Sequence, residues 1–420
     1  MSAAVLPRLE DLEDTSFNIN AATLAQRGET VDPYPLVHRL AAEAPVHPGS
    51  YRQLFPGVPD IFARMGLTQF MVFGYDNVVK VALDQQNFTN AKVLEHYLGP
   101  TFGRSVSAMD APEHTRYRKI FQKAFLPQTV AKWGQTFVDP VIDRLVAKFA
   151  HRGEVELVEE FTHRYPFQVI YSQLGLDAEH APIFHRLAEA QLLNMIGLPQ
   201  GVEAAAKLGR FFEELVVLRR ENPQEDLVSH LATVEADGDR LPDDVLIGFL
   251  RQLMNAGGDT TYRGTSNLMM GLLSNPDQLE AVRNDRTLVP KAIEEALRWE
   301  SPILRGWRYV ERDVDFLGYK LPEGAVLNTV RASANRDPSK YPDPDRFDIS
   351  REHPVKPIPF GIGAHVCIGQ HLARLEMSRA LNALLDRLPN LRLDPDHPPP
   401  HAIGHDGRVP QHIYVRFDPV

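Results

Sequence analysis

The sequence predicts a mainly α-helical protein with a minor β region, and three observations carry this prediction. Apolar side chains recur at helical spacing over most of residues 112–275. After Pro302 the pattern changes to short runs of strand-forming residues separated by turn residues. Helical periodicity returns at 368–388, where leucines share one apolar face.

The domain organisation is expected to be simple. At roughly 150 residues per domain, 420 residues would suggest two or three domains. No stretch of linker-like composition divides the chain, however, so we expect one domain over residues 1–420. Its expected parts are an α-rich core at about 110–300 and 360–390, and β-rich parts at about 65–75, 303–331 and 393–420. Asp406-Gly407, in the last of these, is typical of a β-hairpin.

The first hundred residues predict few long elements. Residues 1–45 look irregular, with short helical pieces. An apolar run at 68–73 followed by Gly74 indicates a strand and a turn, and 76–83 indicates a short helix. Residues 89–109 combine glycine, serine and several apolar side chains, and we expect a long loop there, of the kind that often carries function.

Clearer elements are expected further along the chain. A long apolar helix is predicted at 245–273, and a helix rich in Glu and Ala at 290–299. Short strands are expected around 306–317 and 325–331. Residues 335–359 hold six prolines and few periodic runs, which predicts coil.

Composition excludes several classes of function. With 45 basic and 55 acidic side chains the formal charge is −10, so the chain lacks the basic surface that nucleic-acid binding requires. No run approaches the ~18 uncharged apolar residues of a membrane span, and no signal peptide is visible, so we expect no membrane anchor and a cytoplasmic location. The single cysteine, Cys367, rules out an internal disulfide and a multi-cysteine metal site.

That cysteine stands in a distinctive segment. Residues 360–369 read Phe-Gly-Ile-Gly-Ala-His-Val-Cys-Ile-Gly, a glycine-rich loop that leads into a helix. Glycines let a backbone turn tightly and approach a ligand, and a helix N-terminus lowers the pKa of a thiol. The pattern indicates a thiolate held for a ligand. A buried structural cysteine and a nucleophile assisted by His365 are the two alternatives.

The whole segment resembles the haem-binding loop of the cytochromes P450, the haem-thiolate monooxygenases, whose pattern is Phe-x-x-Gly-x-His/Arg-x-Cys-x-Gly. The resemblance implies that the cofactor is haem b, iron protoporphyrin IX, with Cys367 as the axial ligand of the metal. A thiolate ligand favours cleavage of the O–O bond. Phe360 would pack near the sulfur, and His365 would contact a haem propionate.

Glu295 and Arg298 resemble a second motif of this family. They are three residues apart and share one helical face, which by itself describes an ordinary ion pair. The strings Asn-Arg-Asp-Pro at 335–338 and Pro-Asp-Arg-Phe at 344–347 follow, as in the family. The resemblance implies a buried structural triad of Glu295, Arg298 and Arg346.

The long helix contains Ala-Gly-Gly-Asp-Thr-Thr at 256–261. Glycine in mid-helix costs roughly 1 kcal/mol relative to alanine, so we expect Gly257 and Gly258 to leave room for a planar group or for dioxygen. In isolation, a kinked helix with a solvated aspartate and a back-bonded threonine is the simpler explanation. The resemblance implies a catalytic oxygen-binding groove, with Thr260 hydrogen-bonding oxygen and Asp259 relaying protons.

Three more residues resemble propionate ligands of the family. His114 and Arg118, four residues apart, share a helical face, and a solvated basic face is the alternative. Arg308, ten residues past Arg298, matches the family's other propionate arginine, with Arg305 as its rival.

The resemblance covers roughly residues 65–390 and implies the P450 fold, a single triangular α-rich domain with small sheets, of the soluble bacterial type. The implied reaction is a hydroxylation that inserts one atom of dioxygen into a small or medium hydrophobic substrate and reduces the other to water. No flavin or iron–sulfur segment is present, so we expect a monomer that receives electrons from a separate ferredoxin with its NAD(P)H-dependent reductase. The expected docking patch, or else an ordinary charged surface, comprises Arg116, Lys119, Lys123, Arg374 and Arg379.

The substrate pocket is expected in the 89–109 loop, in the helix before Gly257, and at Ile303 and Leu304. Asn255 would hydrogen-bond either a substrate oxygen or a helix carbonyl. A terpenoid, a steroid or an aromatic molecule would suit apolar walls. Other interpretations are a peroxide-driven haem-thiolate enzyme, a non-catalytic haem-binding or sensing protein, and a haem-free helical protein. The pocket walls are expected from Val93, Leu94, Leu98, Phe102 and Ile303.

Overall fold

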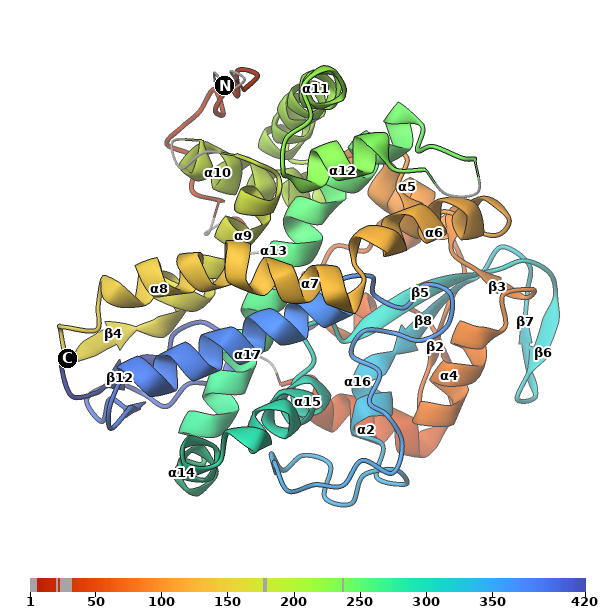
Figure 1. Ribbon diagram of the computed structural model, residues 1–420. Coiled ribbons are helices and arrows are strands. Elements are labelled where there is room, and N and C mark those ends of the chain that lie inside the picture. Colours follow the sequence, from red (N-terminus) through yellow and green to blue (C-terminus); the bar gives the residue numbers. More distant parts are fainter. Residues whose placement is uncertain (1–5, 20–21, 23–31, 177–179, 236–237) are drawn as a thin grey trace.

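The structure is a computed structural model that describes residues 6–19, 22, 32–176, 180–235 and 238–420. It consists of a large helical part and a smaller β-rich part, which lie side by side (Figure 1). The prediction of a mainly α-helical protein with small sheets is confirmed. The single domain over residues 1–420 stays a prediction, and part of the 1–45 segment lies outside the described residues.

The helices define most of the chain. In order, they are α2 (Tyr34–Glu43), α3 (Ile61–Arg64), α4 (Tyr75–Leu83), α5 (Ala91–Phe102), α6 (Glu113–Ala124), α7 (Pro127–Trp133), α8 (Asp139–Ala147), α9 (Tyr165–Gln173), α10 (Ala181–Leu192), α11 (Pro199–Glu221), α12 (Leu227–Thr233), α13 (Asp243–Leu273), α14 (Pro276–Asn284), α15 (Val289–Trp299), α16 (Arg331–Asn335) and α17 (Gln370–Arg387). Short helical turns of other pitch are η1 (Arg52–Leu54), η2 (Val106–Ala108), η3 (Gly134–Val138), η4 (Val158–Thr162), η5 (Leu193–Ile196) and η6 (Arg286–Leu288).

The strands form one sheet of five strands and three smaller ones. They are β1 (Val46–Pro48), β2 (Gln69–Val72), β3 (Phe88–Thr89), β4 (Glu154–Glu156), β5 (Arg305–Val310), β6 (Val314–Phe316), β7 (Tyr319–Leu321), β8 (Val326–Val330), β9 (Arg392–Leu393), β10 (Ala402–Ile403), β11 (Val409–Pro410) and β12 (Tyr414–Arg416). The large sheet has the order β1-β2-β8-β5-β3, in which only β2 and β8 run parallel among the described strands. The small sheets are β4-β12-β9, β6-β7 and β10-β11, and the last confirms the hairpin expected at Asp406-Gly407.

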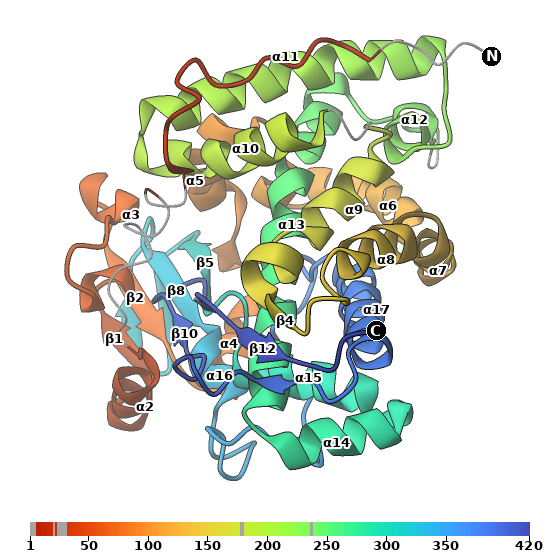
Figure 2. The same cartoon turned by 90° about the vertical axis from the view of Figure 1, so that its left-hand side faces the viewer.

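The long helix α13 is the axis of the helical part. It spans 31 residues and packs against α9, α11, α15 and α17. Figure 2 shows α11 lying across the top of the molecule over α10, with α13 running down beneath them. Pro242 is extended and precedes two aspartates in the first turn, where the positive end of the helix dipole favours negative charge. The helix predicted at 245–273 is therefore confirmed, with two more residues at its start.

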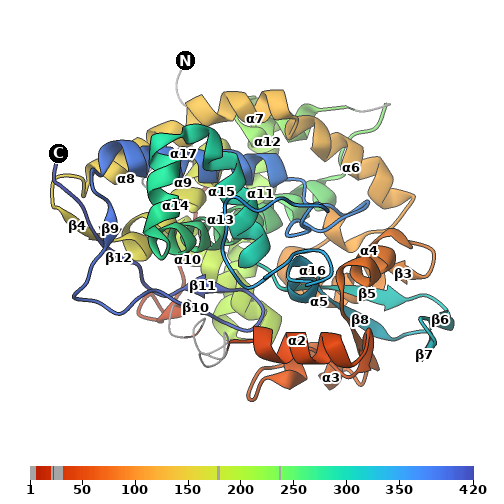
Figure 3. The same ribbon diagram turned by 90° about the horizontal axis from the view of Figure 1, so that it is seen from below.

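Helix α17 lies beside α8 and α15, as the view from below shows (Figure 3). It begins three residues after Cys367, so the packing of its apolar face on the helical core fixes the position of the cysteine loop. Most of 335–359 is irregular, as predicted, and it runs between α16 and the cysteine loop.

The prediction of a long loop at 89–109 is wrong, because most of this segment is helical. Residues Ala91–Phe102 form α5, and Val93, Tyr97 and Thr101 are buried one turn apart along it. The helix ends at Gly103, whose φ of 78° is readily adopted by glycine. None of the helices in the described part of the chain combines the length and the apolarity that crossing a bilayer demands.

Candidate active site

A cavity of about 360 Å³ lies where α13, β5 and the cysteine loop meet. Apolar side chains of α5, α13 and the segment before β5 form much of its wall. A thiol and several cationic side chains from α6, β5 and the loop before α17 complete it. This cavity contains Cys367 together with Arg118, Arg308, Phe360 and His365.

The cysteine loop is shaped by two glycines with positive φ. Gly361 has a φ of 72° and Gly363 one of 82°, values that other residues rarely adopt. A Cβ at Gly363 would also come within 3.0 Å of the Ala82 carbonyl oxygen, so the loop packs directly against α4. The Cys367 N–H donates to the Phe360 carbonyl at 2.9 Å and closes the turn. The backbone therefore holds Sγ at the wall of the cavity.

Burial dominates the electrostatics of the thiol. It raises the pKa of Cys367, because a thiolate is poorly solvated inside the protein. The backbone N–H of Gly369 and the guanidinium groups of Arg118, Arg331 and Arg374 oppose this effect. The net effect disfavours a free thiolate at a residue that is exposed to the cavity, and a metal ion bound to the sulfur would supply the positive charge that stabilises the anion.

Phe360 lines the same cavity, and its ring is covered on one side by Arg374. The guanidinium carbon lies 4.4 Å from the ring centroid, and Arg374 also forms an ion pair with Glu294. The aromatic ring is thereby fixed within the loop that carries the thiol.

The rings of His114 and His365 lie in contact, with their centroids 4.0 Å apart and their planes tilted by 36°. Burial, followed by the charges of His365 and Arg118, lowers the pKa of His114 to about 4, so its ring is neutral at pH 7. Within the described ranges, Nε2 of His114 and Nε of Arg118 are buried without a hydrogen-bond partner. Nη2 of Arg118 donates to the carbonyl of Val366, and Nε2 of His365 lies 3.7 Å from Oδ1 of Asp110.

Arg308, rather than Arg305, is available to an anion in the cavity. Arg305 donates to Asp406 at 2.8 Å and to Asn328 at 2.9 Å. Arg308 donates to the carbonyl of Trp307 at 2.7 Å, and no carboxylate of the described residues lies within 4 Å of it. Burial, and next the charge of Arg331, lowers the pKa of Arg308 to about 10, which still leaves it charged at pH 7.

These residues fit haem b. The porphyrin needs a soft axial ligand for iron, which the thiol provides, and donors for two propionate carboxylates. Buried donors without partners among the described residues include Nε2 of His114, Nε of Arg118 and Nε1 of Trp307. Together with the guanidinium of Arg308, they leave positive charge and hydrogen-bonding capacity uncompensated by the protein itself.

One face of α13 forms a wall of the cavity. Phe249, Gln252, Leu253 and Ala256 line it, at the spacing of one helical face. Gln252 was missed by the sequence analysis, although it lies one turn before Ala256. It exchanges hydrogen bonds with Ser107 at 2.8 and 3.0 Å and places a polar group among the apolar walls.

The two glycines of α13 do not face the cavity. A Cβ at Gly257 would come within 2.5 Å of Ile170, and one at Gly258 within 2.5 Å of Phe167. Both neighbours belong to α9, so the glycines allow α13 and α9 to approach closely. The expectation that they leave room for a planar group or dioxygen is wrong, because each residue turns the helix by about 100° and carries them away from the face of Ala256.

Asp259 and Thr260 follow these glycines. Asp259 accepts two hydrogen bonds from Arg263, at 2.8 and 2.9 Å, and Arg263 is largely buried. The Thr260 hydroxyl donates to the carbonyl of Ala256 at 2.7 Å. The acid is therefore fixed in place by a cation, and the alcohol is back-bonded to the residue that lines the cavity.

The buried ion-pair cluster of α15 differs from the expected triad. Glu295 and Arg298 pair through two hydrogen bonds of 2.7 and 2.8 Å. The second arginine is Arg351, which lies 3.1 Å from Glu295, and His353 lies at 3.2 Å. Burial opposes the charge of Glu295, but its bonds to Arg298 and His353 lower its pKa to about 2.

Arg346 was expected in this cluster and is not part of it. Its side chain is 64% exposed and lies 3.7 Å from Asp348. Only its backbone takes part, because the carbonyl of Arg346 accepts from Arg298 at 3.2 Å. The irregular chain turns the side chain of Arg346 outward and that of Arg351 inward.

Two of the three expected substrate-pocket residues lie elsewhere. Ile303 lines the cavity, but Leu304 is fully buried in a separate cluster with Tyr34 and Tyr51. Asn255 also points away, since it donates to the carbonyl of Ala188 and its side-chain oxygen accepts from Gln191, both on α10. Asn255 thus bonds a helix carbonyl, as in the second of its two interpretations.

The apolar residues expected at the pocket divide in the same way. Leu94 and Leu98 line the cavity together with Ile303. Val93 packs in the core with Phe62, and Phe102 is buried but lies outside the lining of the cavity. The helical form of α5 explains the split, because only one of its faces reaches the cavity.

Several cations of the expected docking patch have partners. The ion pairs are Arg116 with Asp239, Arg374 with Glu294, and Arg379 with Asp139. Lys123 donates to the carbonyl of Glu235.

Comparison with known proteins connects this geometry to a family. A model of the family "Cytochrome P450" matches residues 200–407. The chain is 34% identical over 342 residues to cytochrome P450 107B1 of Saccharopolyspora erythraea, covering 78% of this chain and 84% of that protein. It is 31% identical over 403 residues to 6-deoxyerythronolide B hydroxylase of the same organism, covering 92% and 93%.

The fold also matches solved structures. CYP109E1 of Bacillus megaterium, solved in complex with testosterone, superposes with a TM-score of 0.80 at 26% identity, covering 92% of this chain and all of that chain. The chain therefore belongs to the bacterial cytochromes P450, haem-thiolate monooxygenases that use haem b as cofactor and dioxygen as co-substrate.

Proposed function

We propose that this monooxygenase hydroxylates a medium-sized, largely hydrophobic molecule, with electrons from a separate ferredoxin and its NAD(P)H-dependent reductase. The observation that carries the proposal is the composition of one cavity. It joins a thiol and unpaired cationic donors to an apolar wall that includes a face of α13.

In this proposal Cys367 is the axial ligand of the haem iron. Arg118 and Arg308 hold the propionates, with His114 and His365 beside them, because these residues bring donors that the protein leaves uncompensated. Haem b, when bound, supplies the activation of dioxygen. The protein's part is to orient the substrate, to exclude water and to deliver protons.

Proton delivery falls to two residues of α13. Asp259 pairs with Arg263 as a carboxylate, so it relays a proton only after this ion pair opens. The Thr260 hydroxyl exchanges its bond to the Ala256 carbonyl for one to dioxygen, and so passes the proton into the cavity. Ala256, whose carbonyl accepts the bond of Thr260, lines the cavity.

The lining of the cavity suggests the class of substrate. Leu94, Leu98 and Ile303 offer apolar contacts, and the Gln252–Ser107 pair offers one hydrogen-bonding position. A rigid hydrophobic skeleton with a single oxygen, such as a steroid or terpenoid alcohol or ketone, fits this pattern. The testosterone complex of CYP109E1 supports the choice of a steroid as the first probe.

The electron donor is proposed to dock at Lys119 and Lys123 of α6, with the paired arginines around them exchanging partners on contact. We expect this chain to work in the cytoplasm, together with its donor. We also expect it to be a monomer. Replacing both lysines by Glu should slow reduction of the protein at low salt. Lys320→Glu, at an exposed lysine of the β6–β7 hairpin, serves as control. An unchanged rate in the double variant would remove this docking site.

A reconstituted reaction tests the chemistry. With a surrogate ferredoxin, its reductase, NADH and testosterone, we expect a hydroxylated product that carries one oxygen atom from labelled dioxygen. Thr260→Ala should lower the amount of hydroxylated product formed per NADH consumed. Thr261→Ala, at a buried neighbouring position, should leave this ratio unchanged. Faster turnover with hydrogen peroxide alone would assign the protein to the peroxide-driven enzymes instead.

Spectroscopy tests the ligand separately. The reduced protein with carbon monoxide should show the strongly red-shifted absorption of thiolate-ligated haem, and Cys367→Ser should abolish it. If serine leaves the spectrum unchanged, Cys367 is not the ligand. If no steroid, terpenoid or aromatic compound of a test panel changes the spin state of the haem iron, the proposed substrate class is wrong.

A further inference from the structure

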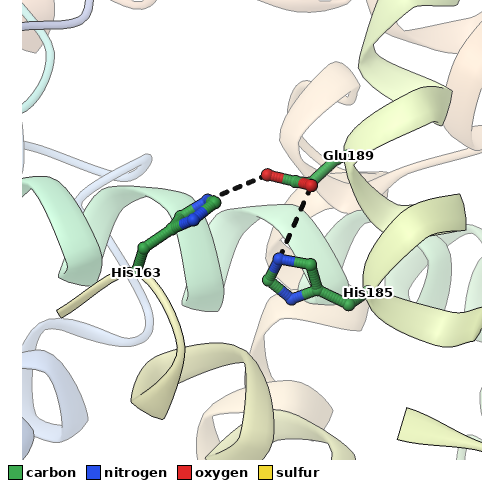
Figure 4. Close-up of side chains that lie close together, drawn as sticks. All are labelled: His163, His185 and Glu189. Atoms are coloured by element: carbon green, nitrogen blue, oxygen red, sulfur yellow. Dashed lines mark ion pairs between the residues drawn. The ribbon is translucent and has the colours of Figure 1, made fainter. Parts of the chain in front are cut away.

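Three metal-ligating side chains converge at a distance from the cysteine cavity. His163 directly follows η4, just before α9, and His185 and Glu189 lie one turn apart on α10 (Figure 4). None of the three lines the cavity that contains Cys367. This is the one group of at least three convergent His, Cys, Asp or Glu side chains found among the described residues.

The distances suit a shared ion. Nε2 of His163 lies 2.8 Å from one carboxylate oxygen of Glu189, and Nε2 of His185 lies 3.5 Å from the other. A set of ligand atoms from all three residues lies within 4.8 Å of one another. Ligands about 2.1 Å from a tetrahedral ion are separated by roughly 3.4 Å, so small side-chain movements would complete the site.

The surroundings give an ion both access and an open coordination position. All three residues line a second cavity, of about 730 Å³. Their side chains are only 22%, 26% and 19% exposed for His163, His185 and Glu189. A metal ion would therefore reach them from the cavity, from which water would complete its coordination.

The charges of the group also suit a cation. Glu189 places a carboxylate beside two imidazoles, and neutral imidazole nitrogens with a carboxylate form a ligand set that binds a divalent cation. Two nearby arginines of the cavity are engaged elsewhere, since Arg164 donates to the carbonyl of Glu159 and Arg186 to Asp11.

Aromatic packing holds the two imidazole rings. The ring of His163 lies 4.6 Å from that of Tyr262, and the ring of His185 lies 4.5 Å from that of Phe167. Fixed rings lose little freedom when they bind an ion, which favours affinity.

We propose that His163, His185 and Glu189 form a binding site for a divalent transition-metal ion, with Zn²⁺ as the ion that two imidazoles, one carboxylate and one water suit best. The ion would join α10 to the segment that leads into α9, and both helices pack against α13. It would thus fix two helices that support α13 from the side away from the cysteine cavity.

The test measures zinc on the tag-free holoenzyme. After treatment with a chelator and dialysis, the protein is titrated with Zn²⁺ and bound metal is measured by elemental analysis. We expect one Zn²⁺ per chain, and at least a tenfold weaker affinity in Glu189→Gln and in His185→Gln. His412→Gln is the matched control. His412 also lies near a glutamate, 3.9 Å from Glu156, but among the described residues this pair is not part of a group of three metal-ligating side chains.

An intact haem spectrum in each variant serves as the test of folding, and His163→Gln replaces any variant that fails it. Zn²⁺ should also raise the melting temperature of the wild-type protein and of His412→Gln, but not that of the site variants. Zinc bound equally well by all variants would place it elsewhere and overturn the proposal. So would the absence of stoichiometric binding to the wild type.

Discussion

Gly258 of α13 lies directly against the ring of Phe167 on α9. A Cβ at this position would approach Cδ1 and Cε1 of the ring to 2.5 Å, and the ring is almost fully buried. The close contact between the two helices therefore depends on a missing side chain, and not on space reserved for a ligand. This relationship changes what a substitution in the Ala-Gly-Gly-Asp-Thr-Thr string is expected to do.

Gly258→Ala should lower the free energy of unfolding by about 1–3 kcal/mol, because overpacking outweighs the better helix propensity of alanine. Substrate-induced spectral shifts should keep their midpoint. Gly99→Ala in α5 is the matched control, since a Cβ there meets nothing closer than 4.0 Å, and should stabilise by about 0.5–1 kcal/mol. Denaturant unfolding of both variants checks the pair, and a neutral Gly258→Ala would contradict the packing role.

Arg351→Met should destabilise the protein by about 2 kcal/mol, because Glu295 loses a charged hydrogen bond in a buried cluster. Arg346→Met removes a guanidinium that is mostly exposed, so its effect should stay below about 0.5 kcal/mol. Thermal unfolding of the two variants side by side measures the difference. Equal losses would restore Arg346 to the cluster.

Asn255→Val should weaken folding and leave substrate affinity unchanged. The valine would remove the bonds to the Ala188 carbonyl and from the Gln191 amide, which keeps only its bond to the Arg251 carbonyl, at a cost of about 1–3 kcal/mol. Gln191→Leu in the same background should recover part of this loss, since the amide that has lost a partner is then removed. Denaturant unfolding gives the stability, and spectral titration gives the affinity. A substrate constant that changes severalfold at intact stability would instead place Asn255 in the pocket.

Glu376 of α17 makes the stability of the protein depend on pH. It is almost fully buried, its Oε2 has no hydrogen-bond partner in the part of the chain that the structure describes, and burial raises its pKa well above the usual value. A raised pKa in the folded state means that the stabilisation is complete below the unfolded pKa, about 4.3, and is lost as the pH rises above it.

Glu376→Gln should therefore gain stability relative to wild type by roughly 1 kcal/mol for each pH unit above 5. Urea unfolding at pH 5, 6 and 7 measures this gain. Asp386→Asn, at an exposed residue of the same helix that pairs with Arg286, should change little at any of these values. Parallel curves for wild type and Glu376→Gln would show that the buried carboxyl is charged.

Helical periodicity predicted the elements that pack against the core, because a helix with an apolar face of three or more turns can bury that face in only one orientation. It failed for α5, where the glycine and serine content of 89–109 was given more weight than Val93, Tyr97 and Thr101 at helical spacing, and where Pro100 also stands inside the helix. A proline inside a helix costs stability, but burial of that face outweighs the cost.

The candidate site was predictable where residue chemistry is rare and not where geometry decides. The single cysteine in its glycine-rich loop needed only the sequence. The choice between Arg346 and Arg351 depends on which way side chains turn from irregular backbone, and no periodicity records that. The direction of Gly257 and Gly258 was in principle accessible, because a helical wheel through Ala256 turns them away.

Arg305, at the wall of the cysteine cavity, is held by a carboxylate made about a hundred residues later in the chain. Asp406, in the turn between β10 and β11, binds Arg305 of β5 and lies 3.7 Å from Arg52 of η1. During synthesis, both arginines are made well before this carboxylate. The ion pairs can therefore form only after most of the chain has left the ribosome, and removal of the segment that carries Asp406 would leave Arg305 without this partner beside the cavity of the thiol.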